Sequence, residues 1–183
     1  MRAPYADIVL LWYSTIAVPL FGVSEVETLI SNEDTKLILD KNLTKYTKSS
    51  LFLYMQGKYN RTVLRDLSLS LASYQLAAQN SAHIREIQSI SIYEMGWLYL
   101  MKLDYQKAFE QFEILHKTSR WSRSFSTYIC AILHGSMNDF AKANQYVKDA
   151  IKILAANTRK SWLVLFFFKR YVPLIINSSC FFL

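Results

Sequence analysis

Apolar residues recur along most of the chain at the three- and four-residue spacing that is typical of amphipathic α-helices. Short polar breaks separate the apolar segments near residues 64–66, 80–83, 102–104, 118–123 and 135–139. The segments between these breaks have the length of helices and are too long for strands. The pattern therefore predicts antiparallel pairs of helices joined by short turns, an all-α fold of the α-solenoid type.

One pair of predicted helices carries small residues where its two helices would have to cross. In YEMGWLYLMKLDYQKAFEQFE, residues 93–113, Gly96 is followed by Ala108 twelve residues on and by Phe112 sixteen residues on. Small side chains let two helices approach closely, and a large ring can fill the space beside them. This spacing resembles that of the tetratricopeptide repeat, a helical hairpin of about 34 residues.

Two other segments repeat the spacing around the anchors Gly57 and Ala131. The positions that follow are Ser70, Tyr74 and Ala77 in the first segment, and Ala143 and Ala150 in the second. In the first segment each position falls one residue late, which predicts an extra residue in its hairpin turn. The residues predicted to pack the hairpins are Gly57, Gly96, Ala108, Phe112, Ala131, Ala143 and Ala150. We expect repeats at about residues 50–81, 84–118 and 122–155, within 47–156, after N-terminal packing helices in 1–46.

Each unit also has a tyrosine three residues before its anchor, on the side of the first helix that faces the groove of such a repeat. The candidate partner-binding residues on this face are Tyr54, Lys58, Arg61, Tyr93, Trp97 and Tyr128. These side chains could pack against a capping helix or line a groove for a partner peptide. Lys58 and Arg61 are one helical turn apart and could either meet a carboxylate or face solvent. Glu94 is expected to face solvent.

The N-terminal segment is uncharged from Ile8 to Ser24, a stretch of 17 residues close to the lower limit for a membrane span. It could be a buried helix, a membrane contact or a signal peptide. We favour the buried helix, with the polar atoms of Tyr13, Ser14 and Thr15 inside a helical core and with Pro19 ending the helix.

Composition and charge narrow the class of protein. Apolar residues make up 52% of the chain and charged residues 19%, so a core can form, and four glycines and three prolines favour helices over a turn-rich β fold. Residues 1–149 contain 16 Lys and Arg and 14 Asp and Glu, a net charge of +2, whereas residues 150–183 contain five basic and no acidic residues. Residues 150–183 therefore carry five of the seven net positive charges, and no nucleic-acid partner is expected. The two cysteines, Cys130 and Cys180, favour a reducing, cytoplasmic compartment.

Nothing in the sequence indicates catalysis. His83, His116 and His134 are far apart in the chain and are interpreted as surface or turn residues, and Asp104 as a helix N-cap. Phosphate-binding glycine motifs, HExxH and GxSxG do not occur. We therefore expect a protein that is not an enzyme and that needs no cofactor or metal.

Four blocks carry a resemblance to a known family: RAPYADIVLLWY, SSLFLYMQGKYNR, REIQSISIYEMGWLYLMKLDYQKAFEQFE and SRWSRSFSTYICA. In this order they resemble the tetratricopeptide repeat protein 39 family from Arg2 to about Leu154, and their sequences are most similar to its C-type branch. The resemblance implies a non-enzymatic scaffold or adaptor that binds other proteins, and it implies that this chain is a fragment of a longer protein. Family members are associated with the mitochondrial outer membrane or inclusion clearance in fungi, and with lipid regulation or cilium assembly in animals.

Residues 157–183 depart from the family pattern and place apolar and aromatic residues around Lys169 and Arg170. This basic tail is either a membrane-associating end or sequence from outside the native protein, and we favour the second interpretation. The expected function is a cytoplasmic protein-interaction scaffold, or one peripheral to a mitochondrial or other organelle membrane. The alternative is a membrane-associated protein anchored by residues 5–23 or 161–183.

Overall fold

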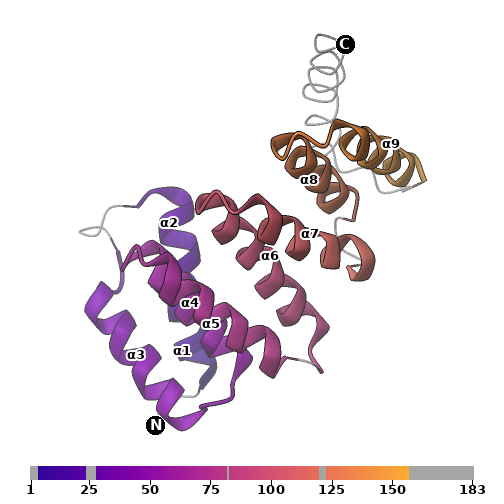
Figure 1. Ribbon diagram of the computed structural model, residues 1–183. Coiled ribbons are helices and arrows are strands. Elements are labelled where there is room, and N and C mark those ends of the chain that lie inside the picture. The colour runs from indigo at the N-terminus through magenta and orange to yellow at the C-terminus, as the bar shows by residue number, and fades with distance from the viewer. Residues whose placement is uncertain (1–3, 24–27, 82, 120–122, 157–183) are drawn as a thin grey trace. The chain divides into compact units, whose positions relative to one another are not determined.

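The computed structural model describes residues 4–23, 28–81, 83–119 and 123–156, and every element within them is helical (Figure 1). In chain order these are α1 (Pro4–Trp12), the π-helical turn η1 (Tyr13–Ala17), α2 (Val18–Phe21), α3 (Asn32–Lys45), α4 (Ser50–Thr62), α5 (Leu67–Asn80), α6 (Arg85–Met101), α7 (Tyr105–Thr118), α8 (Arg123–Ser136) and α9 (Phe140–Ala156). The predicted all-α class is confirmed. The predicted tail, residues 157–183, lies outside the described residues.

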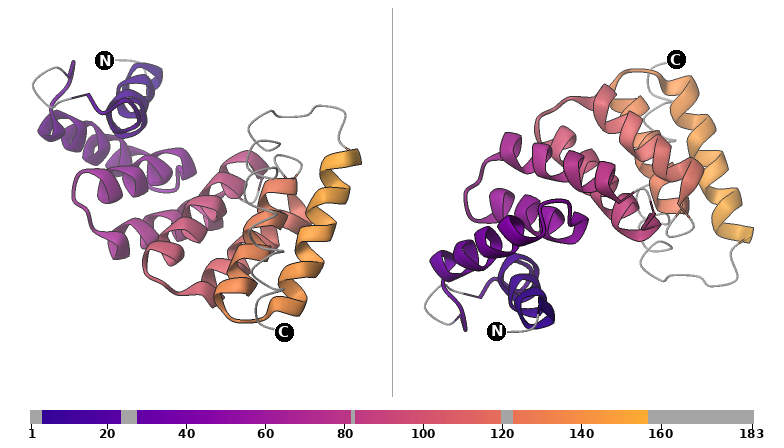
Figure 2. Two further views of the ribbon diagram at one scale, coloured as in Figure 1. Left: turned by 90° about the horizontal axis from the view of Figure 1, so that it is seen from above. Right: turned by 90° about the horizontal axis from the view of Figure 1, so that it is seen from below.

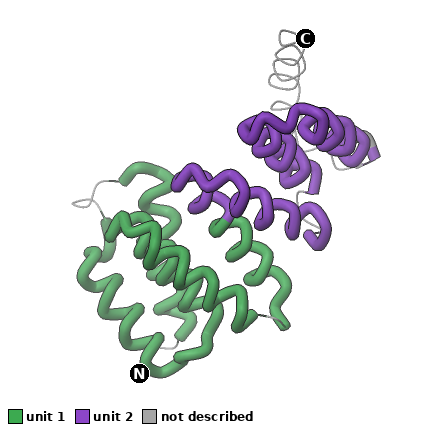
Figure 3. The backbone as a smooth tube through the Cα atoms, viewed as in Figure 1, with its two compact units in different colours: residues 1–95 green, residues 96–183 purple. Residues whose placement is uncertain are grey.

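The chain divides into two compact units, residues 1–95 and 96–183, which Figure 3 draws in two colours. The division falls inside α6, so the first part of this helix belongs to unit 1 and its last part to unit 2. In unit 1, α4 is the central helix, because it contacts α1, η1, α3 and α5. In unit 2, α8 packs against both α7 and α9, and it lies beside α9 in both views of Figure 2.

All three hairpins turn in the same way. The residue before the second helix of each hairpin is an aspartate that caps it: the carboxylate of Asp66 accepts from the Ser68 and Leu69 amides, and Asp104 and Asp139 accept from the amide three residues on. A non-glycine residue in the left-handed conformation precedes each aspartate, with φ of 55° at Arg65, 57° at Leu103 and 62° at Asn138. An N-cap carboxylate satisfies helix amides that would otherwise lack partners. The predicted N-cap role of Asp104 is thus confirmed.

The extra residue predicted for the first turn is present. The amide of Asp66 donates to the carbonyl six residues earlier, on Asn60, whereas those of Asp104 and Asp139 donate to the carbonyl five residues earlier. The added residue therefore widens the turn between α4 and α5 without changing its capping aspartate.

Small residues bring the paired helices together at the anchors. A Cβ atom added at Gly57 would lie 2.5 Å from the Tyr74 ring, and one added at Gly96 would lie 2.6 Å from the Phe112 ring. Ser70 takes the place that Ala108 has in the second hairpin, and its hydroxyl donates to the Gly57 carbonyl at 2.8 Å. In the third hairpin the corresponding residues are also buried: Ala131, Ala143, Val147 and Ala150. In the first two hairpins an aromatic ring therefore occupies the volume that a side chain at the anchor would fill.

The N-terminal segment has its polar groups on the inside. Asp7 is buried, and its carboxylate accepts from Lys41 at 3.0 Å and from Asn42 at 2.8 Å. The hydroxyls of Ser14 and Thr15 are buried and donate to the Leu11 carbonyl, as the buried-helix interpretation expected, whereas Tyr13 is only half-buried.

The prediction that Pro19 ends the first helix is wrong. The helix continues to Phe21 and ends at Gly22, whose φ is 65°. The π-helical turn immediately before Val18 widens the backbone, and such a turn can accommodate a residue that has no amide proton to donate.

Candidate interaction site

Two of the predicted partner-binding residues, Lys58 and Arg61, meet a carboxylate within the protein. Lys58 Nζ lies 2.5 Å from Glu94 Oε1, and Arg61 Nη1 lies 2.8 Å from Glu94 Oε2. Glu94 is only 5% exposed, so the prediction that it faces solvent is wrong. The side chain of Glu94 is covered by α4 of the preceding repeat, which supplies both of its cationic partners. Both cations are therefore already bound to a carboxylate within unit 1.

Tyr54 completes this buried cluster. Its ring lies 5.6 Å from the Tyr74 ring, and Lys58 Nζ lies 5.7 Å from the Tyr54 centroid, within the range of a cation–π interaction. Burial lowers the pKa of Lys58 although Glu94 acts in the opposite direction, and burial together with the Glu94 charge raises the pKa of Tyr54. Tyr54 is thus a packed, neutral phenol rather than an exposed binding residue.

The other three candidates lie on α6 and α8. Tyr128 is buried at 4% exposure, whereas Tyr93 and Trp97 are half-buried. The Trp97 ring meets the Phe112 ring edge to face at 5.7 Å, so it extends the packing around Gly96. Tyr93 and Trp97 keep part of their surface in solvent, and their role in binding stays a prediction.

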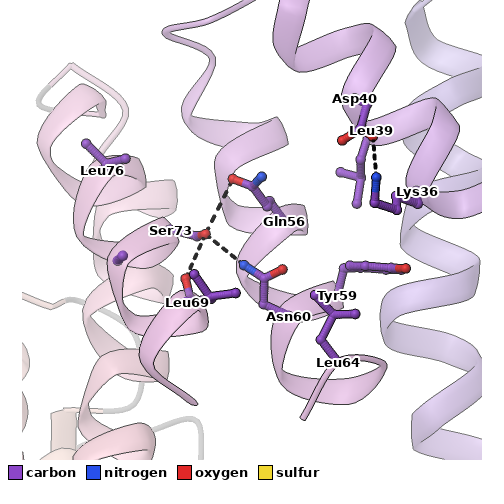
Figure 4. A pocket seen from close by; sticks show the side chains of 11 residues that line it. Lys36, Leu39, Asp40, Gln56, Tyr59, Asn60, Leu64, Leu69, Ser73 and Leu76 are labelled. Atoms are coloured by element: carbon purple, nitrogen blue, oxygen red, sulfur yellow. Dashed lines mark hydrogen bonds and ion pairs between the residues drawn. The ribbon is translucent and has the colours of Figure 1, made fainter. Parts of the chain in front are cut away.

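A pocket of about 330 Å³ lies between α3, α4 and α5 (Figure 4). Its apolar lining includes Leu39 and Tyr59 together with three leucines that keep about half of their surface in solvent: Leu64 at 49%, Leu69 at 52% and Leu76 at 49%. Leu69 and Leu76 are two helical turns apart on α5, so they form one stripe. The sequence did not reveal this pocket, because its lining comes from three helices.

The pocket opens on the side of α4 opposite the Glu94 cluster. Its α4 residues include Gln56 and Asn60, which lie about half a helical turn around α4 from Tyr54 and Lys58. On its α3 side Lys36 and Asp40 form an exposed ion pair at 2.8 Å. The pocket therefore presents apolar surface and carboxamides, with its two charged side chains paired to each other.

The N-terminal segment presents a second apolar surface. Its outward residues are uncharged and include Tyr5 at 77% exposure and Phe21 at 74%, with Val9, Trp12 and Leu20 also exposed. Pro4–Phe21 has 18 residues and a mean hydropathy of 1.3, which among the described helices makes it the one that is long and apolar enough to cross a membrane. Only 22% of this segment is buried.

The histidines of unit 2 lie in an aromatic cluster. His134 stacks on Tyr146 at 5.3 Å and meets Phe109 at 4.5 Å, and it is buried, so its interpretation as a surface or turn residue is wrong. The His116 ring lies 5.9 Å from Tyr146. Burial lowers the pKa of both histidines, while Asp139, 3.6 Å from His134, acts in the opposite direction.

The Thr127 hydroxyl links His116 to the helix backbone. It lies 2.6 Å from His116 Nδ1 and 2.8 Å from the Arg123 carbonyl oxygen.

The described residues include the side-chain types that can hold a metal ion, namely His, Cys, Asp and Glu. Groups of three or more His, Cys, Asp or Glu side chains at metal-binding distance do not occur among these residues. Burial raises the pKa of the Cys130 thiol to about 12, so the thiol stays protonated at neutral pH, and the thiolate is the reactive form of cysteine.

Within the described residues, three hairpins with a small residue at each anchor and an aspartate-capped turn are typical of a helical-repeat protein of the tetratricopeptide class. The family model of Iml2/Tetratricopeptide repeat protein 39 matches residues 1–161, and the chain belongs to this family. The resemblance drawn from the sequence is thereby confirmed, while the C-type branch stays a prediction. Repeats of this class generally mediate contacts between proteins, and the family type is generally non-enzymatic.

Proposed function

We propose that this protein is a non-enzymatic scaffold or adaptor that binds other proteins, and that the pocket between α3, α4 and α5 is one of its binding surfaces. The half-exposed leucines Leu64, Leu69 and Leu76 around the pocket carry this proposal. A soluble monomer rarely leaves clustered large apolar side chains in water unless another molecule covers them. A groove between helices is also a common place for peptide recognition.

Affinity capture with a charge-bearing variant tests the proposal. We expect Leu69→Glu/Leu76→Glu to lose most of the proteins that the wild-type chain captures, because two carboxylates would have to be desolvated in the interface. Leu37→Glu is the matched control, since Leu37 is 66% exposed on α3 and does not line the pocket. Identical captured proteins for all three chains, with equal helicity, would remove the pocket from the function.

A second candidate function is membrane association through the N-terminal segment. The outward apolar residues Tyr5, Val9 and Phe21 favour it, because an uncharged helix surface with tyrosine and tryptophan suits the membrane interface. Flotation of the chain ending at Ala156 with phosphatidylcholine vesicles tests it, with Val9→Glu/Phe21→Glu as the variant. Flotation that the two glutamates abolish would establish membrane contact, and sedimentation of both chains would exclude it.

We further propose a cytoplasmic location. Cys130 is a free, buried cysteine, which is compatible with a reducing compartment. Fractionation of cells that express the full-length protein checks this proposal, and recovery of the protein with sealed organelle lumens would refute it.

A further inference from the structure

The pocket between α3, α4 and α5 contains polar groups as well as leucines. The Asn60 side-chain amide donates to the Ser73 hydroxyl at 3.1 Å, and the Gln56 carbonyl oxygen lies 3.4 Å from the same hydroxyl. Ser73 in turn donates to the Leu69 carbonyl at 3.0 Å. Asn60 and Ser73 are buried, so this network forms part of the pocket wall.

The Asn60 nitrogen donates to Ser73 and the Gln56 oxygen faces the same hydroxyl, whereas the other polar atom of each carboxamide points away from it. Figure 4 shows the Gln56 nitrogen and the Asn60 oxygen directed away from Ser73, toward the side of the pocket where Tyr59 and Leu39 lie. Within the described residues no hydrogen bond to either of these atoms is present. Gln56 and Asn60 are four residues apart on α4 and therefore lie on one face of the helix. The wall thus offers one donor and one acceptor side by side.

We propose that this pocket recognises a segment of a partner protein by an uncharged aliphatic side chain and the peptide group next to it. The aliphatic side chain would lie among Leu39, Leu69 and Leu76, the peptide carbonyl would accept from the Gln56 nitrogen, and the peptide N–H would donate to the Asn60 oxygen. The inference rests on the proposed scaffold function and names the chemistry of its ligand.

Charge and size support a peptide of this kind. Lys36 and Asp40 neutralise each other, so the pocket leaves no single charge to attract an acidic or basic side chain. A volume of about 330 Å³ is at the lower end for ligand pockets, enough for a small group and too little for an extended chain. A donor and an acceptor that face the pocket and lose water on binding also favour a ligand that replaces both hydrogen bonds.

A pair of isosteric probes separates peptide recognition from simple apolar binding. The isotopically labelled full chain is titrated by NMR with N-methyl-4-methylpentanamide and with methyl 4-methylpentanoate, in which an ester oxygen replaces the N–H. We expect the amide to shift the Gln56, Asn60 and Ser73 signals and to bind about five- to tenfold more tightly than the ester, the effect of one hydrogen bond. Equal binding of the two probes, or no binding of either, would overturn the inference.

Variants of the two carboxamides provide the controls. Gln56→Leu and Asn60→Leu should each reduce the preference for the amide to less than about twofold, whereas Gln75→Leu, on the exposed side of α5, should leave it unchanged. Gln56 is only half-buried, so its variant keeps the test valid if Asn60→Leu unfolds. Decanoate that shifts the same signals equally in wild type and Gln56→Leu, without an amide preference, would assign the pocket to lipid chains and refute peptide recognition.

Failure of this inference and failure of the scaffold function would give different experimental results. If Leu69→Glu/Leu76→Glu abolishes capture while amide and ester bind equally, proteins use the pocket but the carboxamides do not select the peptide group. If the leucine variant captures the same proteins as wild type, the scaffold function at this pocket fails and the inference fails with it.

Discussion

Gly57 and Gly96 set how closely the two helices of a hairpin approach. At each position an aromatic ring of the second helix fills the space that a larger side chain would need. We expect Gly57→Ala and Gly96→Ala each to lower the free energy of unfolding by about 1–2 kcal/mol, since overpacking a rigid ring costs more than the better helix propensity of alanine returns. Urea unfolding followed by circular dichroism measures the change.

Gly135 provides the matched control for these two substitutions. It lies in α8, and a Cβ atom added there meets nothing within 4 Å. Gly135→Ala should therefore raise the free energy of unfolding by roughly 0.5–1 kcal/mol. A similar effect at all three glycines would mean that Tyr74 and Phe112 do not fill the anchor positions.

Glu94 holds two cations from the preceding repeat in a nearly buried cluster. Glu94→Ala leaves Lys58, itself 9% exposed, without its counter-ion, and breaking a buried pair in this way costs about 3–5 kcal/mol. The double variant Lys58→Met/Glu94→Met removes the most deeply buried pair. It leaves one cation, Arg61, whose side chain is 22% exposed and can reach solvent, so this variant should lose much less stability than Glu94→Ala. Thermal unfolding of both variants checks the contrast, and equal losses would show that packing, not charge, dominates at this site.

Sequence reasoning found the contacts within a hairpin and missed those between hairpins. Gly57 with Tyr74 and Gly96 with Phe112 follow from one spacing rule, since both partners belong to the same repeat unit. Glu94 was predicted to face solvent because the spacing of apolar residues reports only on contacts within its own hairpin. Its partner Lys58 lies 36 residues earlier, in the preceding hairpin. Burial of such a residue depends on how consecutive repeats stack, which a single-helix pattern does not contain.

At the level of elements, the capped turns carry a signal that could have been read from the sequence. Asp66, Asp104 and Asp139 stand immediately before the second helix of each hairpin, yet only Asp104 was assigned as a cap. The pocket between α3, α4 and α5 had no comparable signal, because Leu39, Gln56 and Leu69 occupy ordinary helical positions and meet only after the helices have packed.

The packing of α7, α8 and α9 around His116 and His134 makes the stability of unit 2 depend on pH. Burial lowers both folded-state pKa values below the ordinary value of about 6.5, so the unfolded chain binds protons first as the pH falls. Stability is therefore complete above about pH 6.5 and declines below it until the folded histidines also protonate. The urea midpoint of the full chain at pH 7.5 and at pH 5.5 tests this, and we expect the lower value at pH 5.5.

A variant without one of the two titrating rings tests the assignment. His134→Phe keeps a ring against Phe109 and Tyr146 but cannot be protonated, so the difference in urea midpoint between the two pH values should shrink. A difference of unchanged size would place the pH dependence elsewhere in the chain.

At the level of the whole molecule, α6 is shared by the two units, because the division falls between Met95 and Gly96. In a repeat protein each unit is stabilised by its neighbours, so damage to a shared helix should spread in both directions. Leu98 is fully buried on the unit 2 part of α6, and Leu98→Ala should cost about 2–5 kcal/mol. Native-state hydrogen exchange should then show reduced protection in α4 of unit 1 as well as in α7.

Leu133→Ala, a substitution at an equally buried leucine in α8, is the control. It should reduce the protection of α7, α8 and α9 while leaving α4 nearly as protected as in wild type. Unaltered protection of α4 in Leu98→Ala would show that the two units fold independently in spite of the helix they share.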